Sequence, residues 1–308
     1  MNITTADSAP LVGATQLAGL EPIEKIRRRW PMLLGLAVSL LMVAGLAKEL
    51  LDKGLVGLSQ TAPSSGLFYL FFALFYLGPP TFDYIIFRRL WKIPASGMVA
   101  LHRKRIANEV VLGYSGEAYF YAWARQRTQM VAAPFGAVKD VSILSAIAGN
   151  AITLGMLALA LPLAVNLLTP AQFNTALVAI GVMVATSVPF LIFSKRVFSL
   201  PRETLWWVFG IHSTRLILGS MLVAIAWHFA MPDVSIGMWL ILAASRMLVS
   251  RLPFVPNKDL LFANFAIILI GQGQALSELL AFTAALTLLV HVMLIAGFGL
   301  LGLIRKDL

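Results

Sequence analysis

The chain has 308 residues, of which 59% are hydrophobic and only 12% are charged, and its mean hydropathy is +0.84. Soluble domains carry about 25% charged residues, so this composition excludes an ordinary soluble protein and indicates one that buries apolar surface in lipid. The net charge of +10 does not imply a nucleic-acid partner, because the basic residues flank apolar segments and suit anionic lipid headgroups. The absence of cysteine excludes disulfides, thiolate catalysis and cysteine-bound metals.

Residues 1–29 predict a disordered cytoplasmic tail, because their first part is polar, small and nearly uncharged. Residues 30–305 predict a single all-α polytopic membrane domain with about eight transmembrane helices. Each crossing of about 30 Å of hydrocarbon takes about 20 residues. The sixth and seventh segments are short, which indicates tilted, broken or re-entrant helices. The predicted spans are residues 31–50, 66–87, 141–168, 174–194, 204–230, 236–250, 258–273 and 279–304.

The distribution of Lys and Arg predicts the orientation. With a cytoplasmic N-terminus, 20 of the 24 basic residues fall in cytoplasmic segments. Only Lys48 and Lys53 then lie in outside loops, and Arg215 and Arg246 lie within spans. Cytoplasmic loops of membrane proteins carry such an excess of Lys and Arg. We therefore expect a multi-pass protein of the cytoplasmic (inner) membrane, with both termini inside and an even number of crossings.

The long connection between segments two and three contains an aromatic stretch that is too short and too polar to span a membrane. Two interpretations of the region 94–130 are open. It forms an amphipathic helix at the interface, or it enters and leaves the membrane on one side as a hairpin broken near Gly113, Ser115 and Gly116. The break favours re-entry. Residues 88–140 are also where we expect a protein partner or a homo-oligomer contact.

A second break lies at residues 251–265, where Pro253 and Pro256 cannot continue a helix and Asp259 begins the next apolar segment. The two breaks correspond at an offset of 142 residues. The matching pairs are Glu117 with Asp259, Phe120 with Phe262, and Ala124 with Ala266. Corresponding broken segments in two halves are typical of transporters, so the pattern predicts two inverted repeats.

These residues are similar to the flippase-like transmembrane region of the lysylphosphatidylglycerol synthase family, in its stand-alone membrane form. The matches to its motifs are Asn108, Leu112, Gly116 and Glu117 in the first half, and Leu252, Pro253 and Pro256 in the second. Gly113 replaces a proline, and residues 257–259 replace the glycines of the second motif. The resemblance covers about residues 31–304 and implies a lipid translocator. No soluble aminoacyl-transferase domain follows the last span, so the synthase reaction is not implied.

Glu117 is the first candidate for a binding residue. An ionisable group at membrane depth predicts function, and a carboxylate in a re-entrant hairpin can bind a cationic headgroup, pair with an arginine or take up a proton. The alternative is an interfacial carboxylate that caps a helix start. Asn108, from the same family motif, is expected to contact the same ligand.

Arg215 lies about 16 Å into the predicted span 204–230, where an arginine costs at least about 2.5 kcal/mol. We therefore expect it to face the protein interior and to bind a lipid phosphate through two hydrogen bonds. The alternative is a structural ion pair with Glu117 or Asp83. His212 lies three residues earlier on the same helix face.

Three further expectations concern charged or metal-binding side chains. Lys258 and Asp259 either bind a headgroup or pair with each other and cap a helix. Asp83 is expected to pair with Arg88 or Arg89 near the end of its span. The four histidines show no metal-ligand spacing, so we expect no metal, no cofactor and no catalytic residue.

The residues therefore predict a lipid or lipid-linked headgroup translocator that binds membrane lipids with anionic headgroups. The alternatives are a membrane-embedded lipid-modifying transferase and a non-transporting assembly or scaffold subunit. Translocation requires Glu117 and Arg215 to face one cavity, whereas the scaffold does not.

Overall fold

The computed structural model describes residues 62–110, 115–127, 134–164, 197–251 and 273–304, with single positions between 37 and 44, between 174 and 188, and at 262, 266 and 267. Helix is the only regular secondary structure in these residues, as the sequence predicted. The helices are α3 (Gly66–Trp91), α4 (Gly97–Val110), α5 (Ser115–Arg127), α6 (Pro134–Ala164), α9 (Arg202–Ala230), α10 (Ile236–Arg251) and α12 (Gly273–Ile304).

Four of these helices, α3, α6, α9 and α12, contain stretches that are long and apolar enough to cross a membrane. They coincide with the predicted spans 66–87, 141–168, 204–230 and 279–304, with ends shifted by several residues. Their length and composition support the prediction of a multi-pass helical membrane protein.

The predicted count of about eight spans is not supported. The segment 236–250 forms α10, whose 16 residues rise about 24 Å and fall short of the hydrocarbon thickness. Apart from isolated helical positions, the predicted spans 31–50, 174–194 and 258–273 lie outside the described residues, and so does the predicted tail 1–29.

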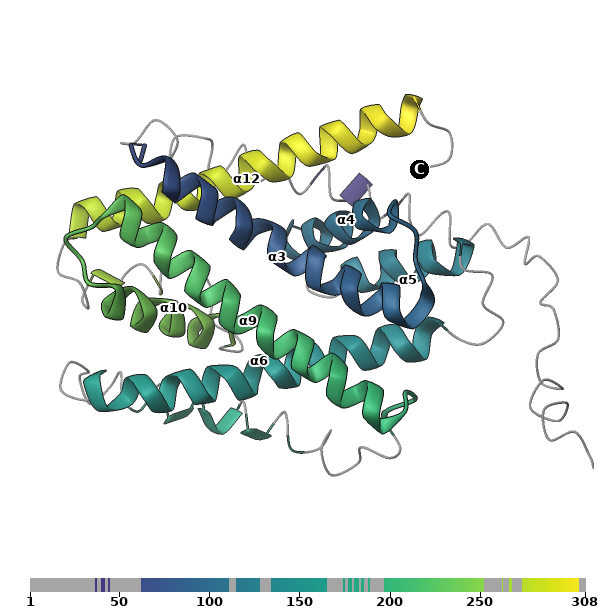
Figure 1. The fold of residues 1–308 in the computed structure, drawn as a ribbon, viewed down its shortest axis with the longest axis horizontal. Coiled ribbons are helices and arrows are strands. Elements are labelled where there is room, and N and C mark those ends of the chain that lie inside the picture. Colours follow the sequence, from purple (N-terminus) through teal and green to yellow (C-terminus); the bar gives the residue numbers. More distant parts are fainter. Residues whose placement is uncertain are drawn as a thin grey trace, which may run out of the picture.

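Helix α9 is the central helix of the bundle, because it packs against α3, α6 and α10 (Figure 1). Two buried apolar clusters hold the helices together at opposite ends. The hairpin core lies where α3 ends and α9 begins, and includes Phe87, Leu101, Phe120, Val141 and Val208. The distal core lies where α9 ends and α12 begins, and includes Phe68, Trp227, Trp239, Leu276 and Phe282.

The directions of the helices agree with the charge count. The positive-inside distribution predicts that the end of α3, the starts of α6 and α9, and the end of α12 share one side of the membrane. These four ends lie together at one end of the bundle in Figure 1, and the hairpin core draws residues from all four helices near them. The start of α10 lies at the opposite end, where Trp239 packs 5.8 Å from Trp227 of α9.

The predicted region 94–130 is a hairpin of two helices, α4 and α5, which pack against each other. Residues 111–114 between them, including Gly113, lie outside the described part, and Ser115 and Gly116 begin α5 instead of interrupting a helix. The inner faces of both helices are buried against α3 and α6, and Leu101, Ile106 and Phe120 are almost completely inaccessible. The hairpin is therefore part of the bundle core, which differs from an amphipathic helix lying alone on a membrane surface.

The start of α5 is joined to α4 by short polar contacts. The backbone N–H of Gly116 donates to Oδ1 of Asn108 at 2.7 Å, and the hydroxyl of Ser115 donates to the carbonyl of Ala107 at 2.8 Å. Gly116 is required at this position, because a β-carbon there would overlap the backbone carbonyl of Lys104. The sequence Ser115–Gly116 thus allows the two helices to approach at the point where Glu117 follows.

The inverted repeat stays a prediction, because Asp259 and most of the second break lie outside the described residues. Phe120, Phe262, Ala124 and Ala266 are buried, and Glu117 is partly buried. Phe120 belongs to the hairpin core, whereas Phe262 and Ala266 belong to the distal core at the other end of the bundle.

Replacing Gly116 with alanine is expected to destabilise the fold by about 1–3 kcal/mol, because the added methyl group meets backbone that cannot move without separating α4 from α5. The measurement is thermal unfolding of the purified protein in detergent. Gly155→Ala in α6 is the matched control, because a β-carbon there meets no atom within 4 Å and the substitution removes a helix-interior glycine. Equal melting temperatures for the two variants would contradict the close approach at Gly116.

Candidate functional site

A polar cavity of about 230 Å³ lies where the hairpin meets the bundle. Side chains from α3, α4, α5, α6 and α9 line it, so its walls come from segments far apart in the sequence. Four of the sequence-predicted site residues, Asn108, Glu117, His212 and Arg215, line this one cavity. The predicted Lys258 and Asp259 lie outside the described residues.

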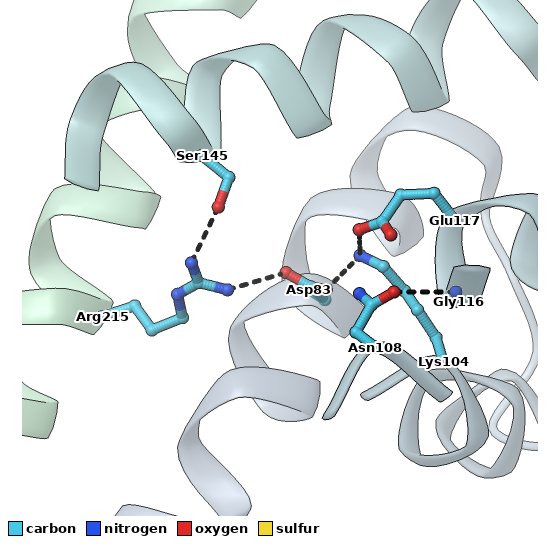
Figure 2. Close-up of polar contacts among 7 residues, drawn as sticks. All are labelled: Asp83, Lys104, Asn108, Gly116, Glu117, Ser145 and Arg215. Atoms are coloured by element: carbon cyan, nitrogen blue, oxygen red, sulfur yellow. Dashed lines mark hydrogen bonds and ion pairs between the residues drawn. The ribbon is translucent and has the colours of Figure 1, made fainter. Parts of the chain in front are cut away.

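A chain of ion pairs crosses the cavity wall, as Figure 2 shows. Nζ of Lys104 lies 2.7 Å from Oδ2 of Asp83 and 3.5 Å from Oε1 of Glu117. The guanidinium of Arg215 lies 3.3 Å from Oδ1 of Asp83 and donates a hydrogen bond of 2.9 Å to the hydroxyl of Ser145. Asp83 is therefore shared by two cations that belong to two different helices.

Arg215 faces the protein interior, as its depth in the span predicted. From Arg202 at the start of α9, it lies 13 residues along the helix, a rise of about 20 Å and close to the middle of this 29-residue span. Its ion pair with Asp83 is the structural alternative that the sequence left open. Ser145 is a further partner, and nothing in the sequence pattern singled that serine out.

The expected pairing of Asp83 with Arg88 or Arg89 is wrong. Arg88 donates to the hydroxyl of Tyr84 at 2.7 Å, and the guanidinium of Arg89 lies over the ring of Trp207 at 4.3 Å. Asp83 is only 7% exposed and turns inward, because its partners lie on α4 and α9. The prediction chose Arg88 and Arg89 because they are close in the sequence. The packing of α3 against α4 and α9 instead brings Asp83 next to Lys104 and Arg215.

Lys104 is the functional residue that the sequence analysis missed. It lies in the basic run of residues 102–105, within a segment that the charge count predicts to be cytoplasmic, but only 7% of it is exposed. Burial alone would lower the pKa of its ammonium, but the neighbouring carboxylates of Asp83 and Glu117 raise that pKa above its usual value, so the lysine stays charged. Its helical spacing from Leu101 and Asn108, which also line the cavity, is the signal that identifies an inward-facing lysine.

Glu117 is held less firmly than Asp83. Its Oε1 makes the 3.5 Å contact with Lys104, whereas its Oε2 is buried and has no hydrogen-bond partner among the described residues. Buried carboxylate oxygens in proteins are usually paired, so an unpaired one on a cavity wall points to a ligand or a proton. Glu117 also lies in the first turn of α5, as the alternative of a carboxylate at a helix start predicted.

Asn108 and His212 complete the wall of the cavity. Asn108 acts first on the hairpin itself, because its carbonyl oxygen accepts the N–H of Gly116. His212 is 1% exposed and lies one helical turn before Arg215 on α9, on the face that the spacing predicted. Both residues present polar atoms to the cavity without carrying a permanent charge.

Two consecutive prolines in α3 create a second polar contact beside the cavity. Pro80 lacks the N–H that would bond to the carbonyl of Tyr76 one turn earlier. Nη1 of Arg105 donates to that carbonyl instead, and its guanidinium lies 4.2 Å from the centre of the Tyr76 ring. Arg105 also pairs with Glu109 at 2.7 Å. The break in the α3 hydrogen bonds is thereby satisfied by α4, which fixes the hairpin against α3.

A larger, mainly apolar cavity of about 860 Å³ adjoins the polar one. It lies between α3, α9 and α10, and Pro79 and Arg215 line both cavities. Leu74, Leu77 and Leu218 on its wall are between 42% and 46% exposed, so the cavity borders the outer, lipid-facing surface of the bundle. Arg215 thus stands at the junction of a polar and an apolar space.

Among the described residues, no three or more His, Cys, Asp or Glu side chains lie close enough together to hold a metal ion. Comparison with known proteins gives no match: no protein-family model, no curated protein and no solved structure is similar to this chain. The family resemblance therefore stays a prediction that rests on motif residues, of which Asn108, Gly116 and Glu117 meet at the hairpin. The fold and the site together indicate a class of protein: a multi-pass helical membrane protein with a cavity lined by charged side chains.

Replacing Asp83 with asparagine is expected to destabilise the protein by about 3–5 kcal/mol, because Lys104 and Arg215 then remain buried without their shared counter-ion. Thermal unfolding in detergent measures the effect. Glu109→Gln is the matched control, because this carboxylate is 42% exposed and its pair with Arg105 stabilises the fold by less than about 1 kcal/mol. An Asp83→Asn protein as stable as wild type would show that the two cations do not depend on this carboxylate.

Proposed function

We propose that this protein binds a membrane lipid, with the headgroup in the polar cavity and an acyl chain in the apolar cavity, and that it moves the headgroup across the membrane. The observation that carries this proposal is the position of Arg215, which lines both cavities. In a phospholipid the phosphate stands between the headgroup and the acyl chains, and a guanidinium binds phosphate through paired hydrogen bonds. The site therefore matches a lipid in the order of its polar and apolar parts.

The dimensions of the two cavities support the same ligand. A polar space of about 230 Å³ is smaller than typical drug-sized pockets, and it suits a compact headgroup. The apolar space of about 860 Å³ is larger and borders exposed leucines on α3 and α9, so an acyl chain has a route from the surrounding lipid. The lateral route would let the lipid bind without leaving the membrane.

The depth of the charges supports translocation over binding at the surface. Arg215 lies near the middle of α9, where ionisable groups are expensive and mark substrate pathways, and it contacts Asp83 toward the end of α3. Besides the apolar hairpin core, the Lys104–Asp83 ion pair joins the hairpin to α3, and a bound phosphate can compete for its cation. Exchange of this contact would allow the hairpin and α9 to move relative to each other, in the manner of transporters that alternate access to a site at mid-membrane.

The two rival functions are less well supported. A scaffold subunit would present the region 88–140 to a partner, but the inner faces of α4 and α5 are buried in the bundle. A transferase would have only Glu117 as a carboxylic acid or base at the cavity, because Asp83 and Glu109 are engaged by cations at 2.7 Å. Glu117 and Arg215 share one cavity, which is the arrangement that translocation requires.

We place the protein in the cytoplasmic membrane with both termini inside, as the positive-inside count predicts. In this orientation the α4–α5 hairpin and the polar cavity belong to the cytoplasmic half of the bundle, where anionic headgroups attract basic residues. The connection between α9 and α10 would face outward.

The orientation is testable with single cysteines, because the chain contains none of its own. Ala95→Cys, just before α4, and Asp233→Cys, between α9 and α10, introduce thiols at exposed positions at opposite ends of the bundle. A membrane-impermeant maleimide added to cells whose outer barrier has been opened should label Asp233→Cys at once. It should label Ala95→Cys only after the cytoplasmic membrane is permeabilised. The reverse pattern would overturn the orientation.

Lipid binding and translocation are testable in reconstituted liposomes, with mass spectrometry of the lipids that co-purify. Wild type is expected to carry bound phospholipid and to accelerate headgroup translocation. Arg215→Gln should lose about tenfold or more in lipid binding, because a charge-assisted hydrogen bond contributes about 1.5–3 kcal/mol, and Glu117→Gln should slow translocation. Arg202→Gln, an exposed arginine at the start of the same helix, is the matched control. No bound lipid, and equal rates for every variant and for empty liposomes, would contradict the proposal.

A further inference from the structure

The charges around the polar cavity are balanced. Three carboxylates and three cations line it, namely Asp83, Glu109 and Glu117 with Lys104, Arg105 and Arg215. On α6, the polar side chains that line it are the uncharged Ser142 and Ser145, and on α9 His212 adds an imidazole. With a neutral imidazole, the resting cavity has no net charge. An anionic headgroup that enters alone would therefore leave a buried excess of negative charge, which is strongly unfavourable.

Each cation of the cavity already has a carboxylate partner. Lys104 contacts Asp83 at 2.7 Å, Arg215 contacts Asp83 at 3.3 Å, and Arg105 contacts Glu109 at 2.7 Å. No positive charge is spare for a phosphate until one of the carboxylates is neutralised. The structure thus links anion binding to a change in the charge of an acidic side chain.

Glu117 is the carboxylate whose neutralisation disturbs the fewest contacts. Asp83 lies between two cations, and Glu109 pairs with Arg105 and lies 3.3 Å from the imidazole of His291 on α12. Glu117 has one ion pair, the 3.5 Å contact with Lys104, and its Oε2 is buried without a partner among the described residues. A proton on that oxygen would satisfy it and would leave Lys104 and Arg215 with a single shared carboxylate.

We propose that Glu117 takes up one proton from water when the phosphate of an anionic lipid binds in the polar cavity, and releases that proton when the lipid leaves. The phosphodiester brings one negative charge and the proton one positive charge, so the cavity stays neutral. The O–H at Oε2 then donates to the ligand, and Lys104 and Arg215 meet the phosphate. This inference rests on the proposed function, and it makes proton uptake the step that couples lipid binding to pH.

The direct test is titration calorimetry of the full chain in detergent with a short-chain phosphatidylglycerol at pH 7. Binding is measured in two buffers of different ionisation enthalpy, and the difference in heat counts the protons taken up. We expect about one proton per lipid and, because binding takes up a proton, an affinity that falls as the pH rises. Glycerophosphoglycerol, the same headgroup without acyl chains, is titrated in parallel.

The variants identify the proton acceptor. Glu117→Gln should still bind the lipid, but without proton uptake and without dependence on pH. Glu203→Gln, an exposed carboxylate on α9, should keep the count near one. His212→Asn should also keep that count, whatever its affinity, because the imidazole is not the acceptor. Loss of uptake in His212→Asn but not in Glu117→Gln would overturn the assignment.

Two outcomes separate this inference from the proposed function. Wild type that binds the lipid with no proton uptake would overturn the inference and leave lipid binding intact. Equal affinity and equal proton uptake for glycerophosphoglycerol would support proton uptake by Glu117. It would overturn the proposal that the bound phosphate belongs to a membrane lipid, because the acyl chains would then add nothing to binding. No binding of either ligand in any buffer would overturn both.

Discussion

The carboxylate of Asp83 joins three helices, α3, α4 and α9, through two buried ion pairs. It lies 2.7 Å from the ammonium of Lys104 on α4 and 3.3 Å from the guanidinium of Arg215 on α9. Charges buried this deeply are stable only when they are paired, so the hairpin, α3 and α9 must keep their relative positions for all three groups to be satisfied. Because Asp83 pairs closely with Lys104, Glu117 has only a 3.5 Å ion pair with that lysine, and its Oε2 has no partner among the described residues. The unpaired oxygen on the cavity wall therefore follows from the pairing of Asp83.

The surrounding fold makes this arrangement possible through small residues and backbone contacts. Gly116 lets α5 approach the Lys104 backbone, and Pro80 frees a carbonyl of α3 that Arg105 then binds. These contacts position the hairpin against α3 and α6, so that its charges face a cavity and not the lipid. Arg215 then joins the polar cavity to the apolar one, and a lipid is the ligand class whose parts follow that order.

Physical arguments that depend on depth predicted the site better than arguments that depend on neighbours in the sequence. The cost of an arginine at mid-membrane placed Arg215 in the interior, and helical spacing placed His212 beside it. Lys104 was missed because a run of basic residues normally indicates a solvated surface, and only tertiary packing buries its members His102 and Lys104. The predicted count of about eight spans is not supported, because apolar composition does not distinguish a short packed helix such as α10 from a span, and three further predicted spans lie outside the described residues. The second break, with Lys258 and Asp259, lies outside the residues that the structure describes.

The central claim is that a lipid headgroup occupies the polar cavity. The most direct test is photocrosslinking in membranes with a phospholipid that carries a photoreactive group next to its phosphate, followed by mass spectrometry of the modified peptides. The account predicts crosslinks on α5 near Glu117 and on α9 near Arg215, and their loss in Arg215→Gln. Crosslinks confined to outward-facing side chains such as Leu159 and Trp206, unchanged by that substitution, would contradict it.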